Sequence, residues 1–489
     1  MNEKATKEPV MTESSTTSQA PPPPPAGNAI SDFGIDTTAL SSQEAVRDYV
    51  SRVRAGQLGS LPAMLGLIAL VLMFAAMSDV FMSLNNIANL LAQGAGRTII
   101  AMGIVFVLLV GEIDLSAGTA SGVCASLMAM HLVEQGNLLG GMGGTVFYAF
   151  LAVLALAALL AALLRIWVGA GLSVLTIVVA LSGLGANPWV EIGLAICAGT
   201  AIGCITGFLV SKIGMPSFVV TLALFMAWQG VILQFIGEGG VLGISSSPVL
   251  NKVANGNLST AGSWALFLIA AGGFAAVTLG RHYSRLHRGL VTQPTPLVLG
   301  KVGVIAALGA VATYLLTINR APNDNIVISG VPYVVPIVLA LLTVGTYVLN
   351  RTRYGRHIYA VGGNREAARR AGINVTKIRA SVFVVCSSVA AVGAIVYSSK
   401  VGSVDPQAGG LNTLLFAVGA AVIGGTSLFG GRGRVFDAVI GGTVLAVVEN
   451  GLGLLGQPAA VVSIVTGLVL LLAATVDALS RKRATGAAR

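Results

Sequence analysis

Charged residues are scarce in this chain. Among its 489 residues, Lys and Arg contribute 29 and Asp and Glu only 19, so that 10% of the residues are charged and 55% are hydrophobic. A soluble domain carries about 25% charged residues. The scarcity excludes an ordinary water-soluble globular fold, and the apolar runs never separate into compact cores joined by polar linkers. The composition predicts an all-α polytopic membrane protein.

Residues that build catalytic and metal centres are also few. The four cysteines lie in apolar stretches, at neither metal-ligand nor loop-disulfide spacing, which predicts buried thiols. Three of the four histidines lie in basic loops, so neither a metal cluster nor a proton relay is indicated. The segment Gly425–Arg432 lacks the Lys-Ser/Thr ending of a phosphate-binding loop. We expect no catalytic residue, no metal and no cofactor in this chain.

What the sequence does contain is a succession of long apolar stretches. A helix needs about 20 residues to cross about 30 Å of hydrocarbon. This length predicts about 12 to 14 transmembrane helices, some of them broken or re-entrant, in a membrane domain at 61–480. Their approximate positions are 62–82, 86–110, 115–133, 145–164, 166–186, 189–210, 216–236, 262–279, 296–317, 327–349, 380–399, 411–428, 435–455 and 459–479.

The two ends of the chain differ from this domain. Residues 1–60 are rich in Pro, Ser and Thr and include the run Pro21–Pro25, which cannot build a core. We expect a disordered cytoplasmic tail there, and a basic cytoplasmic tail at 481–489.

The net charge of +10 is compatible with nucleic-acid binding or with membrane orientation. If the N-terminus is cytoplasmic, the basic residues gather in cytoplasmic segments, as is usual for membrane proteins. Only Lys252, Arg320 and Lys400 fall outside, and Arg97 is undecided. The excess of positive charge is therefore an orientation signal, which argues against a nucleic-acid partner and predicts that both termini are cytoplasmic.

Glycine is abundant, with 62 residues. Gly199, Gly203 and Gly207 follow the small-xxx-small spacing that lets helix backbones approach closely. Gly-rich breaks at 183–185, 424–425 and 430–433 could instead loosen helices beside a transport pathway.

Polar residues inside apolar stretches are candidates for function, because a carboxylate in hydrocarbon costs several kcal/mol unless it faces protein or water. Glu112, Asp114 and Ser116 lie between two apolar runs. They form either a tight turn that caps the next helix or a broken helix that lines a polar route. Glu449 and Asn450 pose a similar choice between helix–helix contact and pathway lining.

The cytoplasmic loop at 350–379 is conspicuously basic and predicts a short helix. Glu366 to Ala371 are good helix formers, Asn364 can cap the start and Gly372 can end the helix. Small side chains in this segment would permit close docking in a groove, whereas a merely solvated loop would need no such helix.

These segments resemble a known family. Glu366-Ala367-Ala368 followed by Gly372 is similar to the loop by which permease subunits of ABC importers dock on their ATPases. With 111–118, 216–222, 356–363 and 422–428, the chain resembles the monosaccharide branch of these importers, and most closely xylose-type permeases. A stretch at 141–185 departs from the family pattern and is interpreted as an inserted helical hairpin.

The resemblance implies a permease homodimer in the bacterial inner membrane, in contact with lipid. A cytoplasmic ABC ATPase would bind ATP and Mg, and an extracytoplasmic sugar-binding protein would deliver the cargo. The resemblance assigns coupling to Asn364, Arg365, Glu366, Ala367, Ala368 and Gly372, and places Glu112, Asp114 and Ser116 near the pathway. An ion-coupled secondary transporter, using Asp114 or Glu449, and a membrane scaffold that acts through its tail are the alternatives.

Overall fold

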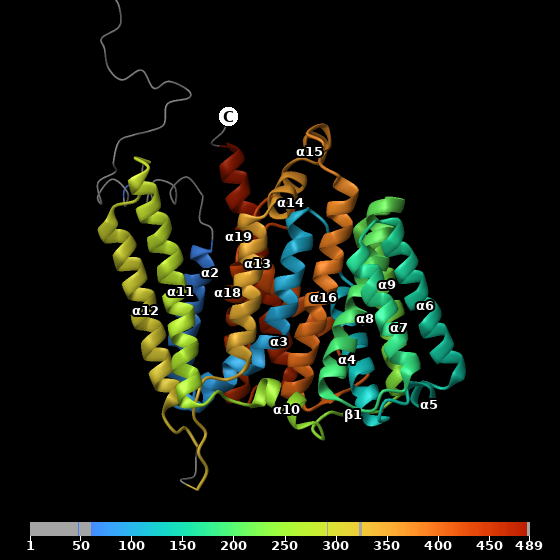
Figure 1. Cartoon of the computed structure of the whole chain (residues 1–489). Helices are drawn as coiled ribbons and strands as arrows, with labels where there is room; N and C mark the ends of the chain where they lie inside the picture. The colour runs from blue at the N-terminus through green and yellow to red at the C-terminus, as the bar shows by residue number, and fades with distance from the viewer. Residues whose placement is uncertain (1–46, 48–59, 291, 322–324, 487–489) are drawn as a thin grey trace, which may run out of the picture.

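The structure is a computed structural model that describes residues 47, 60–290, 292–321 and 325–486 (Figure 1). The predicted tail at 1–60 lies outside the described residues apart from Arg47 and Ser60, and the last three residues of the chain lie outside them too. The regular secondary structure of the described chain is almost entirely α-helical, as predicted.

Every predicted apolar stretch contains a helix. Among the described residues, 9 helices are long and apolar enough to cross a membrane, and shorter apolar helices complete the predicted set. The set comprises α2 (Leu61–Met77), α3 (Leu84–Leu109), α4 (Ala117–Val133), α6 (Gly144–Leu163), α7 (Trp167–Ser182), α8 (Pro188–Phe208, continued by the π-helical turn η1, Leu209–Ile213), α9 (Ser217–Ile236), α11 (Thr260–His287), α12 (Thr295–Thr317), α13 (Val334–Arg351), α16 (Val375–Val401), α17 (Leu411–Ile423), α18 (Val435–Leu454) and α19 (Ala459–Gly486).

Short elements cover the two ends of this bundle. The helices α14 (Arg353–Gly363) and α15 (Arg365–Arg370) lie at the same end as the last turns of α19 (Figure 1). At the opposite end lie α5 (Leu138–Met142), α10 (Pro248–Asn255) and the antiparallel strands β1 (Leu242–Gly243) and β2 (Ser403–Val404). We call these the α15 end and the β1 end.

Helix α16 is the centre of the bundle, and glycines let it approach its neighbours. A Cβ atom on Gly199, Gly203 or Gly207 of α8 would lie 2.6–2.7 Å from the backbone of α16. The predicted close packing at this spacing is confirmed. On the other side of α16, a Cβ on Gly103 of α3 would lie 2.8 Å from the carbonyl oxygen of Cys386. Helices α3 and α8 are therefore fixed against α16 at backbone distance, as dense packing requires.

Two hairpins flank this core. Helices α6 and α7 pair and pack on α8 at one edge of the molecule, and α11 pairs with α12 at the other (Figure 1). A helical hairpin is thus present within 141–185, while its status as an insertion stays a prediction.

Some helices differ in length from their predicted stretches. Helix α11 continues to His287, through basic residues that we expected in a loop. A helix of 28 residues is about 42 Å long, whereas the hydrocarbon is about 30 Å thick. The basic end of α11 can therefore be helical and still lie outside the hydrocarbon. Helix α13 begins only at Val334, since the preceding chain is held by α12 and α11: the Gly330 amide donates to the Leu316 carbonyl of α12, and the Val331 amide donates to the Ser263 hydroxyl of α11.

Candidate coupling and translocation site

The predicted short helix of the basic loop is present as α15. The Asn364 side chain accepts a hydrogen bond from the Ala367 amide at 2.9 Å, as an N-cap does. Gly372 follows the helix end with a φ of +80°, a conformation that glycine adopts without steric cost. The sequence therefore predicted both ends of α15 correctly.

The predicted coupling residues of α15 differ in their exposure. Asn364, Arg365, Glu366, Ala367 and Gly372 are exposed and available to a partner. Ala368, in contrast, is only 4% exposed and packs into the chain's own core. Its small side chain seats α15 on the bundle, so the expectation that it lies on the docking face is not met.

Arg365 connects α15 to the turn between α3 and α4. Its guanidinium donates to a carboxylate oxygen of Glu112 at 2.7 Å and to the carbonyls of Val110 and Gly111 at 3.2 Å. Arg379, in the first turns of α16, donates to the same carboxylate oxygen at 2.7 Å. Glu112 is 4% exposed, and two cations therefore compensate its charge.

Two loops and helix α14 meet beside this ion pair, with glycines at their contacts. The Gly431 amide donates to the carbonyl of Leu109 at 2.9 Å, and Gly362 lies against both residues. The Tyr359 hydroxyl donates to the carbonyl of Gly433 at 2.8 Å, and burial raises the pKa of this phenol, so it stays protonated as a donor. The α3–α4 turn, α14 and the α17–α18 loop, all segments that carry the family resemblance, are thus joined at the α15 end.

The α3–α4 turn continues into the bundle rather than along its surface. Asp114 lies against the thiol of Cys386. The backbone of Cys386 packs against Gly103 of α3. Gly103 precedes the end of α3 by six residues, which corresponds to about 9 Å along the helix. Asp114 Oδ1 accepts hydrogen bonds from the Ser116 amide at 2.9 Å and hydroxyl at 2.6 Å. These hydrogen bonds are those of a tight turn before α4, and the position of the turn within the bundle makes it a break between two buried helices. That the break lines a polar route stays a prediction.

A second break enters from the β1 end and was missed in the sequence. After β2, the chain 405–410 runs between α4 and α9, where the Gln229 side chain donates to the Pro406 carbonyl at 2.5 Å. A Cβ on Gly118 would lie 2.5 Å from the Gly409 carbonyl, so the two breaks touch. The signal was the Pro and paired Gly of Asp405–Gly410 between two apolar runs.

Glu449 is ion-paired within the helix bundle. Its two carboxylate oxygens accept from the guanidinium of Arg97 at 2.7 and 2.5 Å, and this guanidinium lies 4.3 Å from the ring centroid of Phe416. Asn450 exchanges two 2.9 Å hydrogen bonds with Asn86. The pairs join α3 to α18, so these residues make helix–helix contacts. Arg97, unassigned from the sequence, is the missing partner.

A further buried polar pair went unrecognised in the sequence. His131 at the end of α4 and Glu191 at the start of α8 are fully buried, with Nδ1 and Oε1 3.1 Å apart. The signal was a lone Glu after Pro188 in an apolar run. This pair joins α4 to α8 at the β1 end.

Metal-binding and thiol chemistry find no support in the described part of the chain. It contains no group of three or more His, Cys, Asp or Glu side chains that could hold a metal ion. All four cysteines are buried and unpaired, which confirms the prediction of buried thiols.

Comparison with known proteins identifies the family. Residues 167–474 match the family described as branched-chain amino acid transport system / permease component. No solved structure matches the chain.

Curated relatives extend this similarity over most of the chain. The chain is 32% identical to the xylose transport system permease protein XylH of Escherichia coli K12, over 85% of this chain and 91% of that protein. It is 31% identical to XylH of Haemophilus influenzae, over 86% and 96% of the two chains. It is 28% identical to the ribose import permease protein RbsC of Escherichia coli K12, over 88% and 96%.

The matched region contains α15, the second break and the α17–α18 loop, while the XylH similarity covers 85% of the chain. The predicted family is therefore confirmed, and so is the expectation of a non-catalytic subunit. This chain belongs to the transport-permease family of ABC importers and is a membrane-spanning permease rather than an enzyme.

Proposed function

We propose that this permease imports a monosaccharide, xylose or a related pentose or hexose, across the bacterial inner membrane. In this proposal two copies of the chain form the membrane unit, and a binding protein delivers the sugar at the β1 end. A cytoplasmic ATPase docks at the α15 end and binds ATP and Mg. Both termini are then cytoplasmic, as the distribution of basic residues indicates.

The sugar assignment rests on the relatives. The description of the matched family names branched-chain amino acids as the cargo. The relatives that match along most of the chain are instead named for xylose and ribose. The xylose permeases share 31–32% identity with this chain and the ribose permease 28%. Because xylose and ribose are both pentoses, a pentose is the favoured cargo.

The contact between Arg365 and Glu112 carries the coupling proposal. Exposed residues of α15 (Arg365, Glu366 and Ala367) offer a surface to the ATPase, and Arg365 also reaches inward to the α3–α4 turn. That turn continues to Asp114 and Ser116 inside the bundle. A displacement of α15 is therefore transmitted through a charge-assisted hydrogen bond to the break that lines the proposed pathway.

Asp114, Ser116 and the second break form the proposed narrow part of this pathway. Glu449 and Asn450 contribute to the wall of the pathway through their contacts with α3, because Arg97 and Asn86 of α3 bind their side chains. The alternative of an ion-coupled transporter loses a candidate, because the Arg97 guanidinium already compensates the charge of Glu449.

Uptake into proteoliposomes tests the proposal. The chain is reconstituted with its ATPase, and uptake of radiolabelled xylose is measured with binding protein outside and ATP inside. We expect uptake that requires both partners and is reduced by unlabelled ribose more than by leucine. Uptake driven by an ion gradient without the ATPase would contradict an ATP-driven importer, and uptake of leucine alone would contradict the sugar assignment.

A further inference from the structure

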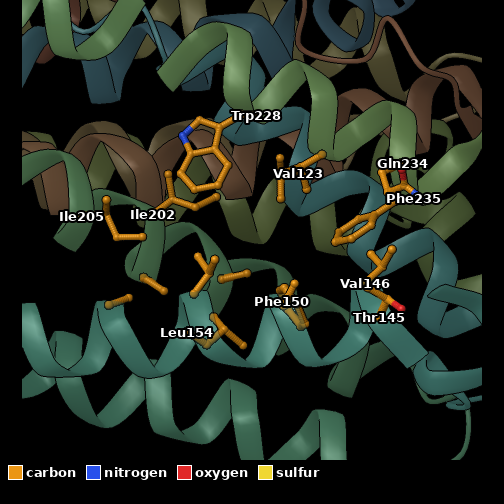
Figure 2. Close-up of a pocket in the computed structure, with 16 residues that line it drawn as sticks. Val123, Thr145, Val146, Phe150, Leu154, Ile202, Ile205, Trp228, Gln234 and Phe235 are labelled. Atoms are coloured by element: carbon orange, nitrogen blue, oxygen red, sulfur yellow. The ribbon is translucent and has the colours of Figure 1, made fainter. Parts of the chain in front are cut away.

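An apolar cavity of about 300 Å³ lies outside the proposed pathway, between α4, α6, α8 and α9 (Figure 2). Its back wall is buried and comes from α8, where Ala201 and Ile202 are 1% and 5% exposed. Its front is open, because Val153 of α6 lines the cavity and is 37% exposed. The cavity is therefore accessible from the side of the bundle, between α6 and α9.

The lining is apolar except at one end. Thr145 and Gln234 both lie at that end, on facing walls (Figure 2), in the first turn of α6 and the last turn of α9. Both belong to the β1 end, where spanning helices leave the hydrocarbon. From Thr145 to Ala157 the α6 wall extends about 18 Å. The cavity is thus a narrow apolar slot whose polar end is level with the membrane surface.

This distribution of polarity does not fit a sugar. A buried hydroxyl needs a hydrogen-bond partner, and a monosaccharide brings several. In the deep part of the cavity Trp228 is the one lining residue with a polar side-chain atom, and its indole nitrogen lies on the side of the ring away from Phe150 (Figure 2). An apolar chain, in contrast, needs no partner and gains dispersion contacts with the walls that an empty cavity forfeits.

We propose that the cavity binds one acyl chain of a membrane phospholipid, with the headgroup beside Thr145 and Gln234. The bilayer surrounds the open side, since α6 and α9 present exposed apolar side chains outward, including Leu156, Leu159 and Met226. The acyl chain fills the space between the α6–α7 hairpin and α9 and thereby joins the hairpin to the core. Edge-to-face contact between Phe150 and Phe235, with ring centroids 5.9 Å apart, bridges the same two helices.

Photocrosslinking of the full chain tests this site. The chain is reconstituted in phosphatidylethanolamine and phosphatidylglycerol vesicles that contain a phospholipid with a diazirine in one acyl chain. After irradiation, labelled peptides are located by mass spectrometry. We expect labelling of the buried segment Ala198–Ile205 of α8, which bulk lipid cannot reach. Labelling confined to the outward faces of α6 and α9 would overturn the proposal.

Two matched variants show whether the label requires the cavity. Val153→Phe fills the opening, whereas Ala155→Phe adds a ring to an exposed position that does not line the cavity. Displacing even two methylene groups weakens binding about tenfold, so we expect Val153→Phe to lower α8 labelling about tenfold and Ala155→Phe to leave it unchanged. Equal labelling of both variants would overturn the site.

Two further arms keep the test interpretable. Ala149→Phe blocks the opening one helical turn away from Val153. The labelling of this variant is compared with that of the unchanged chain only if thermal unfolding shows that the two are equally stable. A diazirine-bearing free fatty acid replaces the phospholipid in a parallel sample. If only the fatty acid labelled α8, a phospholipid source would be wrong.

Discussion

Individual charged side chains in this permease hold breaks and helices together instead of standing free in the pathway. Among the candidate pathway residues, Glu112 is bound by two arginines and Glu449 by one. A buried carboxylate needs such a partner, since the charge would otherwise be neutralised or very costly. Glu112 and Glu449 therefore have structural roles first, and we expect their effects on transport to follow from the helices and turns that they hold in place.

The Glu112–Arg365 contact can be measured by a double-mutant cycle. We expect Arg365→Ala and Glu112→Gln each to lower ATP-driven uptake about tenfold, because a charge-assisted hydrogen bond contributes about 1.5–3 kcal/mol. Because Glu112 also binds Arg379, the double variant should lose little more than Glu112→Gln alone. Arg285→Ala, at an exposed position of α11, is the control. Fully additive losses would show that the two residues act separately.

The Arg97–Glu449 pair makes a prediction about stability. Arg97→Met leaves the Glu449 carboxylate unpaired, and we expect it to cost about 3–5 kcal/mol. The double variant Arg97→Met with Glu449→Leu should recover most of this loss, because no uncompensated charge remains. Thermal unfolding in detergent measures both. Equal destabilisation by the single and double variants would mean that the ion pair is not the cause.

At the scale of elements, glycine decides where segments can meet. The two breaks touch at Gly118 and Gly409, and the loops of the α15 end meet at Gly111, Gly362 and Gly430. Close backbone approach needs the absence of a side chain, and broken helices inside a membrane need neighbours to satisfy their free backbone groups. The breaks therefore depend on each other.

Two Gly→Ala variants test this dependence and should differ in sign. At Gly118 the added Cβ meets the Gly409 carbonyl at 2.5 Å, so we expect a loss of about 1–3 kcal/mol. At Gly193 of α8 nothing lies within 4 Å, and alanine should stabilise the helix by about 0.5–1 kcal/mol. Thermal unfolding compares the two. A neutral Gly118→Ala would contradict the tight contact between the breaks.

At the scale of the whole molecule, charge separates the two ends of the bundle. Arg365, Arg369 and Arg370 of α15 lie at one end, whereas Lys252 in α10 lies at the other (Figure 1). The fold also returns both ends of the membrane domain, Leu61 and the last turn of α19, to the α15 end. If the positive-inside rule holds, this is the cytoplasmic end.

Cysteine labelling determines the orientation directly. The four native thiols are buried, so a membrane-impermeant maleimide should react little with the unchanged chain in intact cells. We expect Glu238→Cys, exposed at the β1 end, to be labelled from outside, and Arg369→Cys only after the cells are opened. The reverse pattern would contradict the predicted orientation of the termini.

Much of this structure was predictable from local patterns. The length of each apolar run predicted its helix, and Asn364 and Gly372 predicted the two ends of α15, because capping depends on a few adjacent residues. The Gly spacing in α8 predicted close packing. The family resemblance added the importer assignment, which the relatives confirm.

Partners across long sequence separations were not predictable in this way. Arg97 lies 352 residues from Glu449, and Glu112 lies 253 residues from Arg365. No local pattern gives such pairings, because they depend on which helices become neighbours. The second break was missed for a related reason, since Pro and Gly in a loop have the same pattern whether the loop lies at the surface or inside the bundle.

The sequence by itself determined that this chain is a helical membrane protein with a predicted orientation and a capped basic helix, because hydrophobic length, charge asymmetry and capping are local properties. Its resemblance to a known family added that it is a permease. Only the tertiary structure decided that Ala368 packs inward, that Glu112 and Glu449 are ion-paired and that two breaks meet at Gly118. Burial and pairing are properties of neighbours, and in a helix bundle the neighbours come from the whole length of the chain.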